Sequence, residues 1–316
     1  MPPSSPPDSV AAAVLRDSWG IAVAPERAAP GTSRNTWRVD STFWLSHSDA
    51  TEGPSFRREA QLLEALPGIL AARRACWCVP GVVSTVSGEC IAVTRDGVWR
   101  LARHMPGEQP DMREADTYLA LARMLAELHG VLESVPHSLK VRELGAVERA
   151  QAFIAAYGMS SFHPATEDAR EVLAVGAIVD WLVPRIGELA SLPRHLIHGD
   201  WTPPNIKVLP QGWGVLDWEF SRIDPAVMDL AQSCITILIW SGLDSPAEHI
   251  SRLVKTYSAH SGREISIDSV RTAMAVYWLQ NYSYWRGRQE TVGGFEDVMV
   301  RQPGRLLAIA EFLGAR

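Results

Sequence analysis

Short apolar and β-branched runs separated by polar turns predict strands in the N-terminal third of the chain. Thr36 to Val39 and Thr42 to Leu45 form one pair of such runs. Val79 to Val86, Glu89 to Thr94 and Val98 to Ala102 follow, with Ser-Gly and Asp-Gly at the turns between them. Because Asp-Gly between two such runs is typical of a hairpin, we expect the last two to pair. The region therefore predicts a mainly antiparallel sheet.

One segment of the same region has the periodicity of a helix. In FRREAQLLEALPG, residues 56–68, apolar side chains recur every three or four positions. Proline cannot continue a helix without the loss of a backbone hydrogen bond, so we expect this helix to end at Pro67 and Gly68. A second Pro/Gly break, MPGEQPD at residues 105–111, is the expected domain boundary.

Beyond this break the pattern is helical. Leu121, Leu125, Leu128 and Leu132 fall on one face of a helix that begins near Arg113. The same periodicity continues in six later segments: Leu144 to Tyr157, Ala169 to Leu189, Pro225 to Trp240, Ala247 to Ser258, Ser269 to Trp285 and Gly304 to Leu313. Strand-like residues interrupt the helical pattern only between His195 and Phe220.

These patterns predict an α+β fold with two lobes. Residues 1–18 are rich in proline and are expected to be disordered or frayed. Residues 19–104 are expected to form a small antiparallel β lobe with one helix, and residues 105–316 a larger helical lobe.

Composition narrows the classes of function. The net charge of −6 gives no basic excess for binding nucleic acid or an anionic membrane surface. No apolar run approaches the ~20 residues that span a bilayer, and the N-terminus lacks the basic and apolar regions of a signal peptide. We expect a cytoplasmic protein, monomeric or dimeric, whose partner is a small molecule. Its cysteines, Cys76, Cys78, Cys90 and Cys234, do not have the spacing of a zinc site and are expected to be free thiols.

The strand-like segment contains side chains of the types that phosphoryl transfer requires. An apolar run leads into His198, Gly199 and Asp200, and Asn205 follows five residues after the aspartate. Transfer of a γ-phosphoryl group needs a carboxylate that takes the acceptor's proton, and Mg²⁺ at the phosphates. Asp200 is the candidate base, and His198 is expected to brace the loop.

The metal ligands are expected from a hairpin in the same segment. Ile206 to Val208 and Trp213 to Leu216 are short strands around a Leu-Pro-Gln-Gly turn, and a hairpin of this length folds back on itself. It therefore brings Asp217 close to Asn205, and both have the oxygen ligands that Mg²⁺ prefers. A D-x4-N spacing alone is more often a surface loop, but its combination with His-Gly, the hairpin and a second aspartate favours kinase chemistry.

The sequence resembles the aminoglycoside phosphotransferase and choline-kinase-like family, whose members are small-molecule kinases with a protein-kinase-like fold. HGDWTPPN is similar to the family's H-G-D-x-x-x-x-N catalytic loop. VLDWEFSRIDPAVMDLA is similar to its metal-binding segment, which is followed by Asp-Leu-Ala at the start of a helix. The resemblance implies that Asp200 is the catalytic base, that Asn205 and Asp217 bind Mg²⁺, and that Asp229 steadies the catalytic loop.

In the small lobe the resemblance implies a nucleotide site with one departure. GTSRNTWRV is similar to the glycine turn and second strand that cover the nucleotide phosphates, and Glu59 matches a helix glutamate that pairs with a strand lysine. Ser46 stands where that lysine is expected, and no lysine precedes residue 140. We expect an arginine in its place, Arg38 before Arg57 and Arg58. The residues expected to bind the nucleotide, ATP or GTP, are Gly31, Ser33, Asn35, Arg38, Ser46, Glu59 and His104.

The acceptor is expected beside the catalytic loop and the helices of the large lobe. The last long helix carries two stripes, one of which includes Trp278 and is expected to be core. The other includes polar members and is expected to face the substrate. Aromatic walls with a few polar groups suit a sugar or nucleoside-like acceptor. The candidate substrate residues are Trp201, Glu219, Trp240, Tyr277, Asn281, Tyr284 and Arg288.

These features favour an O-phosphotransferase for an antibiotic or natural product, which would give resistance or self-protection. The same chemistry on homoserine, choline or a sugar is the alternative. A nucleotide-binding pseudokinase comes last, because the missing lysine alone suggests it while base and metal ligands are intact. The choice between ATP and GTP depends on backbone contacts and stays open.

Overall fold

Contacts within the chain divide it into two units, each described here by itself. The computed structural model describes residues 6–28, 34–73, 77–157, 169–210, 212–286 and 303–315. Unit 1 comprises Met1–Gln109, Ser138–Arg142 and Pro204–Ser221, and unit 2 comprises Pro110–His137, Glu143–Pro203 and Arg222–Arg316. The expected division after residue 104 therefore misses two later segments that return to unit 1.

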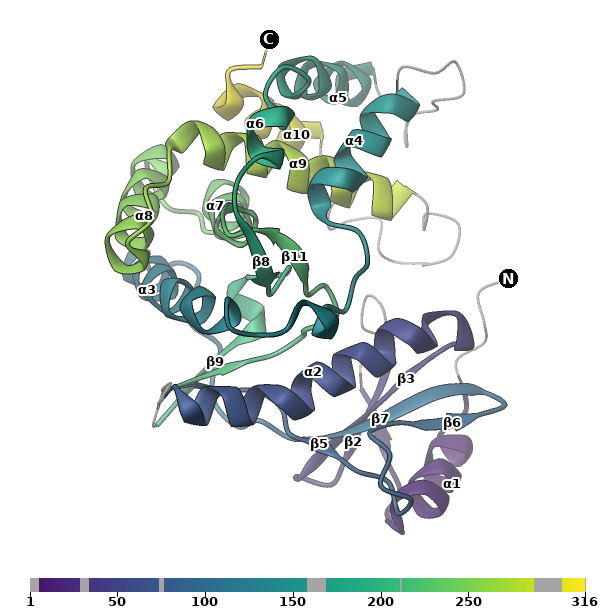
Figure 1. The fold of residues 1–316 in the computed structure, drawn as a ribbon. Coiled ribbons are helices and arrows are strands. Elements are labelled where there is room, and N and C mark those ends of the chain that lie inside the picture. Colours follow the sequence, from purple (N-terminus) through teal and green to yellow (C-terminus); the bar gives the residue numbers. More distant parts are fainter. Residues whose placement is uncertain are drawn as a thin grey trace. The chain divides into compact units, whose positions relative to one another are not determined.

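Unit 1 is built on an antiparallel sheet, as the short apolar and β-branched runs predict (Figure 1). Strands β1, β2, β3, β7 and β5 pair in that order, and β6 pairs with β7. Their bounds are Glu26–Arg27, Asn35–Val39, Phe43–Ser48, Gly97–Arg103, Val82–Val83 and Ala92–Thr94, respectively. The expected hairpin between β6 and β7 is present, with Thr94 opposite Gly97. Gly97 has a φ of 132°, and a Cβ there would lie 2.3 Å from the carbonyl oxygen of Ser48, so only glycine fits.

Helix α2, Gly53–Ala72, is longer than its sequence pattern predicts. It follows the 3₁₀ helix η1, Ala50–Glu52, and does not end at Pro67 but continues through it. Pro67 is on the exposed side, whereas Leu66 and Leu70 are buried. Burial of these two leucines offsets the one backbone hydrogen bond that proline removes.

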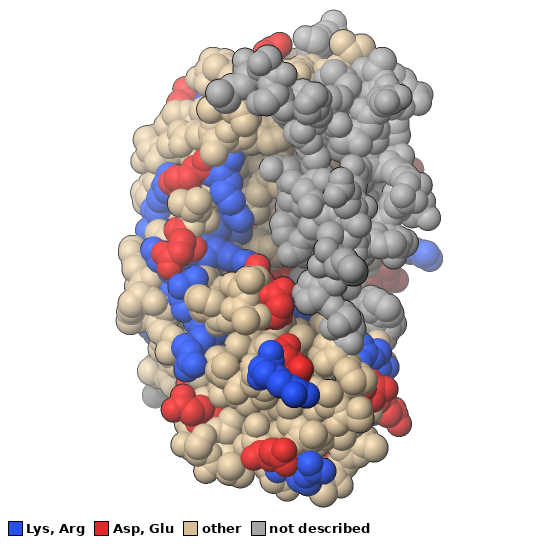
Figure 2. Space-filling view, turned by 90° about the vertical axis from the view of Figure 1, so that its right-hand side faces the viewer, with Lys and Arg blue, Asp and Glu red and all other residues tan. Residues whose placement is uncertain are grey.

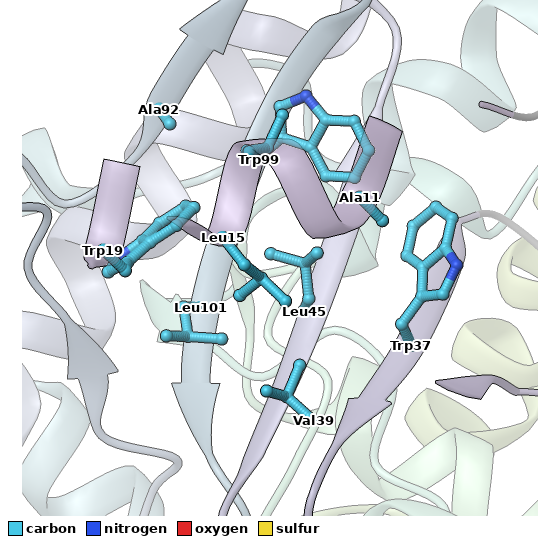
Figure 3. Packing of buried hydrophobic residues seen from close by; sticks show 10 residues of the cluster. Ala11, Leu15, Trp19, Trp37, Val39, Leu45, Ala92, Trp99 and Leu101 are labelled. Carbon is cyan, nitrogen blue, oxygen red and sulfur yellow. The ribbon is translucent and has the colours of Figure 1, made fainter. Parts of the chain in front are cut away.

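The N-terminal segment corrects another expectation, because the described part of residues 1–18 is mostly helical. Asp8–Trp19 form helix α1, whose Leu15 and Trp19 are buried against one face of the sheet (Figure 3). Trp37 and Trp99 come from the strands to the same cluster. The indole Nε1 of Trp37 also donates to Asp8 at 2.8 Å. Helix α1 is ordered because its apolar face packs against the sheet, although the proline-rich composition of the segment alone predicts disorder.

A second, three-stranded sheet of unit 1 contains the hairpin predicted around the Leu-Pro-Gln-Gly turn. Strand β9, Ile206–Leu209, is antiparallel to β10, Gly212–Val215. Along its other edge, β10 pairs in parallel with β4, Trp77–Cys78. The ladder aligns Ile206, the first residue of β9, with Val215, the last residue of β10. The residue before β9 and the residue after β10 therefore lie at the same end of the hairpin.

Unit 2 is mainly helical, which confirms the α+β prediction. The two-stranded sheet of β8, Arg194–Ile197, and β11, Arg222–Pro225, lies near α7 (Figure 1). Helix α7, Val227–Ile239, is buried on nearly all sides and packs against α8 and α9. The other α-helices are α3, Ala115–Leu132; α4, Ala146–Tyr157; α5, Ala169–Leu182; α6, Ile186–Ala190; α8, Pro246–Ser261; α9, Ile267–Arg286; and α10, Pro303–Leu313. Two more 3₁₀ helices are His137–Leu139 and Pro203–Asn205. Across the described ranges, no helix has the length and apolar character needed to span a bilayer.

Candidate active site

The residues expected to form the catalytic loop follow directly from strand β8 in unit 2. Residues 195–197 of this strand are buried and pair with β11, which fixes the direction in which the chain leaves the sheet. Gly199 has a φ of 83°, a left-handed conformation that residues with side chains rarely adopt. Asp200 comes next and is partly exposed, as a base that must meet a substrate needs to be.

Asp229, in the first turn of α7, holds the first half of this loop. Its carboxylate is fully buried and accepts hydrogen bonds from the backbone N–H groups of His198 at 2.9 Å and Gly199 at 2.7 Å. Nε2 of His129 lies 3.0 Å from the same carboxylate. Burial alone would raise the Asp229 pKa, but the hydrogen bond and charge of His129 and the hydrogen bond from the Gly199 N–H together hold that pKa below its ordinary value. The carboxylate therefore stays ionised and keeps accepting both backbone donors.

Gln232, one turn further along α7, holds the other half of the loop. Its side-chain oxygen accepts the backbone N–H of Trp201, and its Nε2 donates to the carbonyl oxygen of Gly199 at 2.6 Å. Arg222 donates to the same carbonyl from Nη1 at 3.2 Å. The peptide groups on both sides of Asp200 are thus fixed by buried side chains. A carboxylate held in this way can meet a hydroxyl with little loss of orientational freedom.

Replacement of Gln232 by leucine is expected to lower kcat at least ~10-fold, because an error of about 1 Å in the position of Asp200 already costs more than that. The buried N–H of Trp201 loses its acceptor, so the free energy of unfolding should fall by about 1–3 kcal/mol. Steady-state kinetics and urea unfolding measure the two effects.

Thr236→Val is the matched control for this variant. Thr236 lies one turn beyond Gln232 on α7, and its hydroxyl donates to the carbonyl oxygen of Gln232 within the helix. We expect kcat to stay within about twofold of the unsubstituted protein, since the change leaves the loop contacts in place. A Gln232→Leu protein with unchanged kcat would contradict a role for Gln232 in positioning the base.

The rings of His198 and Trp201 are both fully buried. Nδ1 of His198 accepts the backbone N–H of Asp200 at 3.2 Å, and its ring stands edge-on to Trp201 with 5.9 Å between centroids. This geometry suits a positioning role for His198. It corrects the expectation that Trp201 lines the acceptor site, because the indole has no exposed surface.

The hairpin of unit 1 brings the two candidate metal ligands together. Beyond the aligned pair of Ile206 and Val215, the backbone N–H of Leu216 donates to the carbonyl oxygen of Asn205 at 2.8 Å. Asp217 follows with an exposed side chain and a φ of 56°, a strained conformation for a residue other than glycine. Such strain is found where a side chain must be aimed in one direction.

These two side chains fit a magnesium ion that is shared with a nucleotide. No group of three or more His, Cys, Asp or Glu side chains suited to a metal occurs within the residues that the structure describes. Mg²⁺ does not need such a cage, because one or two protein oxygens together with phosphates and water complete its shell. The carboxylate of Asp217 and the amide oxygen of Asn205 supply that number.

A buried cluster of two arginines and two glutamates lies in unit 1. Nη1 of Arg34 is 2.6 Å from Glu59, and its Nη2 is 3.0 Å from Glu219. Nη1 of Arg100 is 2.9 Å from the second carboxylate oxygen of Glu59. Burial alone would raise the Glu59 pKa, but the charges of Arg100 and Arg34 outweigh it and keep that pKa below its ordinary value. Glu219, which was expected at the acceptor, is instead buried beside Arg34.

The three arginines expected to replace the lysine lie elsewhere in unit 1. Arg38 is exposed, and its Nε donates to the carbonyl oxygen of Asp40 at 2.9 Å. Arg57 lies 3.6 Å from Glu89 on the surface. Arg58 donates to the carbonyl oxygen of Val141 at 2.9 Å. The structure therefore pairs Glu59 with Arg34 and Arg100, which sequence reasoning missed.

The remaining nucleotide candidates of unit 1 are only partly described. Asn35 begins β2, with its Nδ2 3.5 Å from a ring nitrogen of His47. Nδ1 of the exposed His104 accepts the indole N–H of Trp44 at 2.8 Å. Gly31 and Ser33 lie outside the described residues.

The acceptor candidates of unit 2 remain predictions. Trp240, at the end of α7, and Tyr277, in α9, are half-buried, whereas Trp278 belongs to the core as expected. The side chains of Asn281 and Tyr284 lie outside the described part of the structure, as does Arg288.

A signal for one of the missed residues was present in the sequence. Gln232 stands three positions after Asp229 in a segment read as a helix, and residues at that spacing share a face. Prediction of Arg100 would have required the register between β3 and β7, and these two strands are far apart in the chain. Arg34 is the basic residue next to the glycine turn, and its neighbour Glu219 could not be inferred from spacing.

Comparison with protein families gives a match over most of the chain. A model described as the phosphotransferase enzyme family matches residues 26–264. No significant match occurs among curated protein sequences.

Solved structures extend the likeness over nearly the whole chain. A spectinomycin phosphotransferase in complex with ADP and spectinomycin is 13% identical, covers 98% of this chain and 95% of its own, and has a TM-score of 0.61. A phosphotransferase in a GDP and kanamycin complex is 14% identical, covers 96% of each chain and has a TM-score of 0.61. An aminoglycoside phosphotransferase from Streptomyces rimosus is 18% identical, covers 86% of this chain and 97% of its own, and has a TM-score of 0.61. At such identities the likeness establishes the fold, and the protein-kinase-like α+β prediction is confirmed.

Proposed function

Because the chain belongs to the phosphotransferase enzyme family and is a small-molecule kinase, we propose that it phosphorylates an antibiotic or natural product. The donor is ATP or GTP, and the acceptor is a hydroxyl group on a molecule with sugar or nucleoside character. Resistance or self-protection is the proposed role. The structures similar to this chain include complexes of antibiotic phosphotransferases with ADP and with GDP. These complexes support a nucleotide donor and leave open whether its nucleobase is adenine or guanine.

One observation carries this proposal more than any other. The loop at Asp200 is held on both sides by buried hydrogen bonds from α7, while the Asp200 side chain itself remains partly exposed. A surface loop without a catalytic role has no need of a fully buried carboxylate and amide beneath its backbone. This arrangement supports Asp200 as the base.

In the proposed reaction, Asp200 accepts the proton of the acceptor hydroxyl as that oxygen forms its bond to the γ-phosphorus. The bond between the γ-phosphorus and the bridging oxygen breaks, and the nucleoside diphosphate leaves. Asn205 and Asp217 would hold Mg²⁺, which supplies positive charge to the phosphates when it is bound. His198, Asp229 and Gln232 orient the base without touching substrate.

The acceptor's charge can be inferred from the region that should bind it. From residue 228 onward the chain has nine acidic and nine basic side chains. One of the acids, Asp229, is buried beneath the catalytic loop and cannot meet a ligand. Lys and Arg side chains also lie close to Asp and Glu side chains on the face drawn in Figure 2. A polycationic ligand needs an excess of carboxylates, because each desolvated ammonium group must be paired.

We therefore expect a neutral or anionic hydroxylated acceptor and poor phosphorylation of kanamycin-like polyamines. The purified protein would be tested against antibiotics and common metabolites in an assay that measures release of the nucleoside diphosphate, with ATP and GTP in parallel. Competition between acceptors then gives relative kcat/KM values.

Efficient phosphorylation of a polyamine aminoglycoside, with no preference for uncharged or acidic acceptors, would overturn the charge argument. Turnover confined to homoserine, choline or a simple sugar would instead establish the alternative of a metabolite kinase. Nucleotide binding without turnover on any acceptor would point to a pseudokinase.

A further inference from the structure

Ser46 lies directly beside Arg100 in the sheet of unit 1. In the antiparallel ladder of β3 and β7, Ser46 is opposite Arg100, and on the other side it is opposite Thr36 of β2. Residues that are opposite each other in neighbouring strands point to the same face, with Cβ atoms about 5 Å apart. The next residues along these strands, Leu45 and Leu101, point to the opposite face, which packs against α1. Arg100 therefore shares the face on which Ser46 replaces the expected lysine.

Arg100 reaches the glutamate that the absent lysine would have bound. Glu59, on α2, is almost completely buried, with 2% of its side chain exposed, and Nη1 of Arg100 lies 2.9 Å from it. Only 9% of the Arg100 side chain is exposed, and its Nε has no hydrogen-bond partner among the described residues. A buried guanidinium with an unused donor is expected beside a ligand that supplies an acceptor.

Arg34 pairs with the carboxylate oxygen of Glu59 that Arg100 does not contact, and it extends the cluster toward the proposed metal ligand Asp217. Its guanidinium also pairs with Glu219, two residues after Asp217. Burial would lower the Arg34 pKa, but the charges of Glu59, Glu219 and Asp217 raise it above the ordinary value, so the group stays charged. A guanidinium has five N–H donors, and the two pairs leave others for a further acceptor.

The ring of Phe56 fixes both arginines in place. The guanidinium carbon of Arg34 lies 4.7 Å from the ring centroid, and that of Arg100 lies 5.0 Å from it. Planar guanidinium groups stack on aromatic rings, which limits the motion of their N–H donors. Two cations are thus held near three carboxylates, Glu59, Asp217 and Glu219, which would otherwise repel a polyphosphate.

We propose that Arg34 and Arg100 form the phosphate-binding cation site in place of the strand lysine. Arg34 and Arg100 both donate to the phosphates of a nucleoside di- or triphosphate, and Arg100 also takes the lysine's place at Glu59. This inference rests on the proposed function, since it names the groups that neutralise the donor nucleotide. Arginine suits the role because its donors match phosphate oxygens in pairs.

The test measures binding of a nucleoside diphosphate and of its nucleoside to Arg34→Met, Arg100→Met and the unsubstituted protein, by calorimetry with Mg²⁺ present. ADP with adenosine and GDP with guanosine are both used. Each substitution should weaken diphosphate binding about 10- to 100-fold, as loss of a charge-assisted contact implies. Nucleoside affinity should change less than about threefold, because the nucleoside has no phosphate for the arginines to contact.

Arg95→Met is the control, because Arg95 is on the turn between β6 and β7 with 90% of its side chain exposed. It should bind both ligands as the unsubstituted protein does. If Arg34→Met and Arg100→Met bind the diphosphate with unchanged affinity, the inference is wrong. An equal loss of diphosphate and nucleoside binding would also overturn it, since that result indicates general damage to the fold.

Restoration of a lysine gives a second, independent test of Arg100. When Ser46→Lys is added to Arg100→Met, an ammonium group stands on β3, opposite position 100 and on the same face of the sheet. The double variant should recover at least ~10-fold in diphosphate affinity relative to Arg100→Met. Thermal unfolding of both proteins shows whether each is folded. No recovery in a folded double variant would remove Arg100 from the lysine's role. Failure of the unsubstituted protein to bind any nucleotide would overturn the proposed function itself, and this inference with it.

Discussion

Asp200→Asn is expected to lower kcat at least ~10²-fold, the lower end of what a general base contributes. The amide is nearly isosteric with the carboxylate but cannot accept the hydroxyl proton. The backbone contacts of the loop come from other side chains, among them Asp229, Gln232 and Arg222, which the substitution leaves in place. The variant should therefore unfold at the same temperature as the unsubstituted protein and bind the nucleotide with similar affinity.

Single-turnover measurements with saturating nucleotide isolate the chemical step for this variant. Asp180→Asn serves as the control, because Asp180 is an exposed carboxylate of α5 in the same unit. If Asp200→Asn retains activity within a few-fold, Asp200 is not the base, and another group must take the proton.

Asp217→Ala should abolish Mg²⁺-dependent turnover and weaken nucleotide binding much more with Mg²⁺ than with EDTA. The reason is that this carboxylate is the charged member of the proposed ligand pair, and an amide oxygen alone binds a hard divalent cation weakly. Nucleotide titrations in both buffers measure the difference. Equal nucleotide affinities with and without Mg²⁺ in both proteins would contradict the assignment of Asn205 and Asp217.

Backbone strain complicates this variant and can be separated by a control. Asp217 has a φ of 56°, and alanine tolerates that conformation less well than aspartate or asparagine. Asp40, in the turn between β2 and β3, has a φ of 52°. Asp40→Ala therefore carries a similar conformational cost without removing a proposed metal ligand. It should lose stability as Asp217→Ala does but keep its dependence on Mg²⁺.

The elements and residues that local pattern specifies could be predicted from sequence. Strands β2, β3 and β7 and the hairpin of β9 and β10 follow from short apolar and β-branched runs and from turn chemistry. The proximity of Asn205 to the segment before Asp217 follows from the length of that hairpin. These features depend on residues that are close together in the chain.

Features that depend on distant residues were predicted less well. Helix α1 is held by Trp37 and Trp99, and its own residues do not reveal those partners. The pairing of Arg34 with Glu219 joins positions 185 residues apart in the chain (219 − 34). Trp201 was expected at the acceptor from its place beside Asp200, but its side chain is buried and its backbone N–H donates to Gln232. Burial of an aromatic ring depends on tertiary contacts that spacing along one strand or loop does not specify.

The parallel pairing of β4 with β10 has a consequence for synthesis of the chain. Trp77 aligns with Trp213, so β4 is made 136 residues before the strand that completes its sheet. At a translation rate of ~5–20 residues per second, β4 emerges roughly 7 to 27 s before β10 does. During that time the edge of β4 that later pairs with β10 is unpaired and accessible to other nascent chains or chaperones. An N-terminal fragment that stops at Gln109 would keep this edge permanently, so unit 1 is better studied within the whole chain.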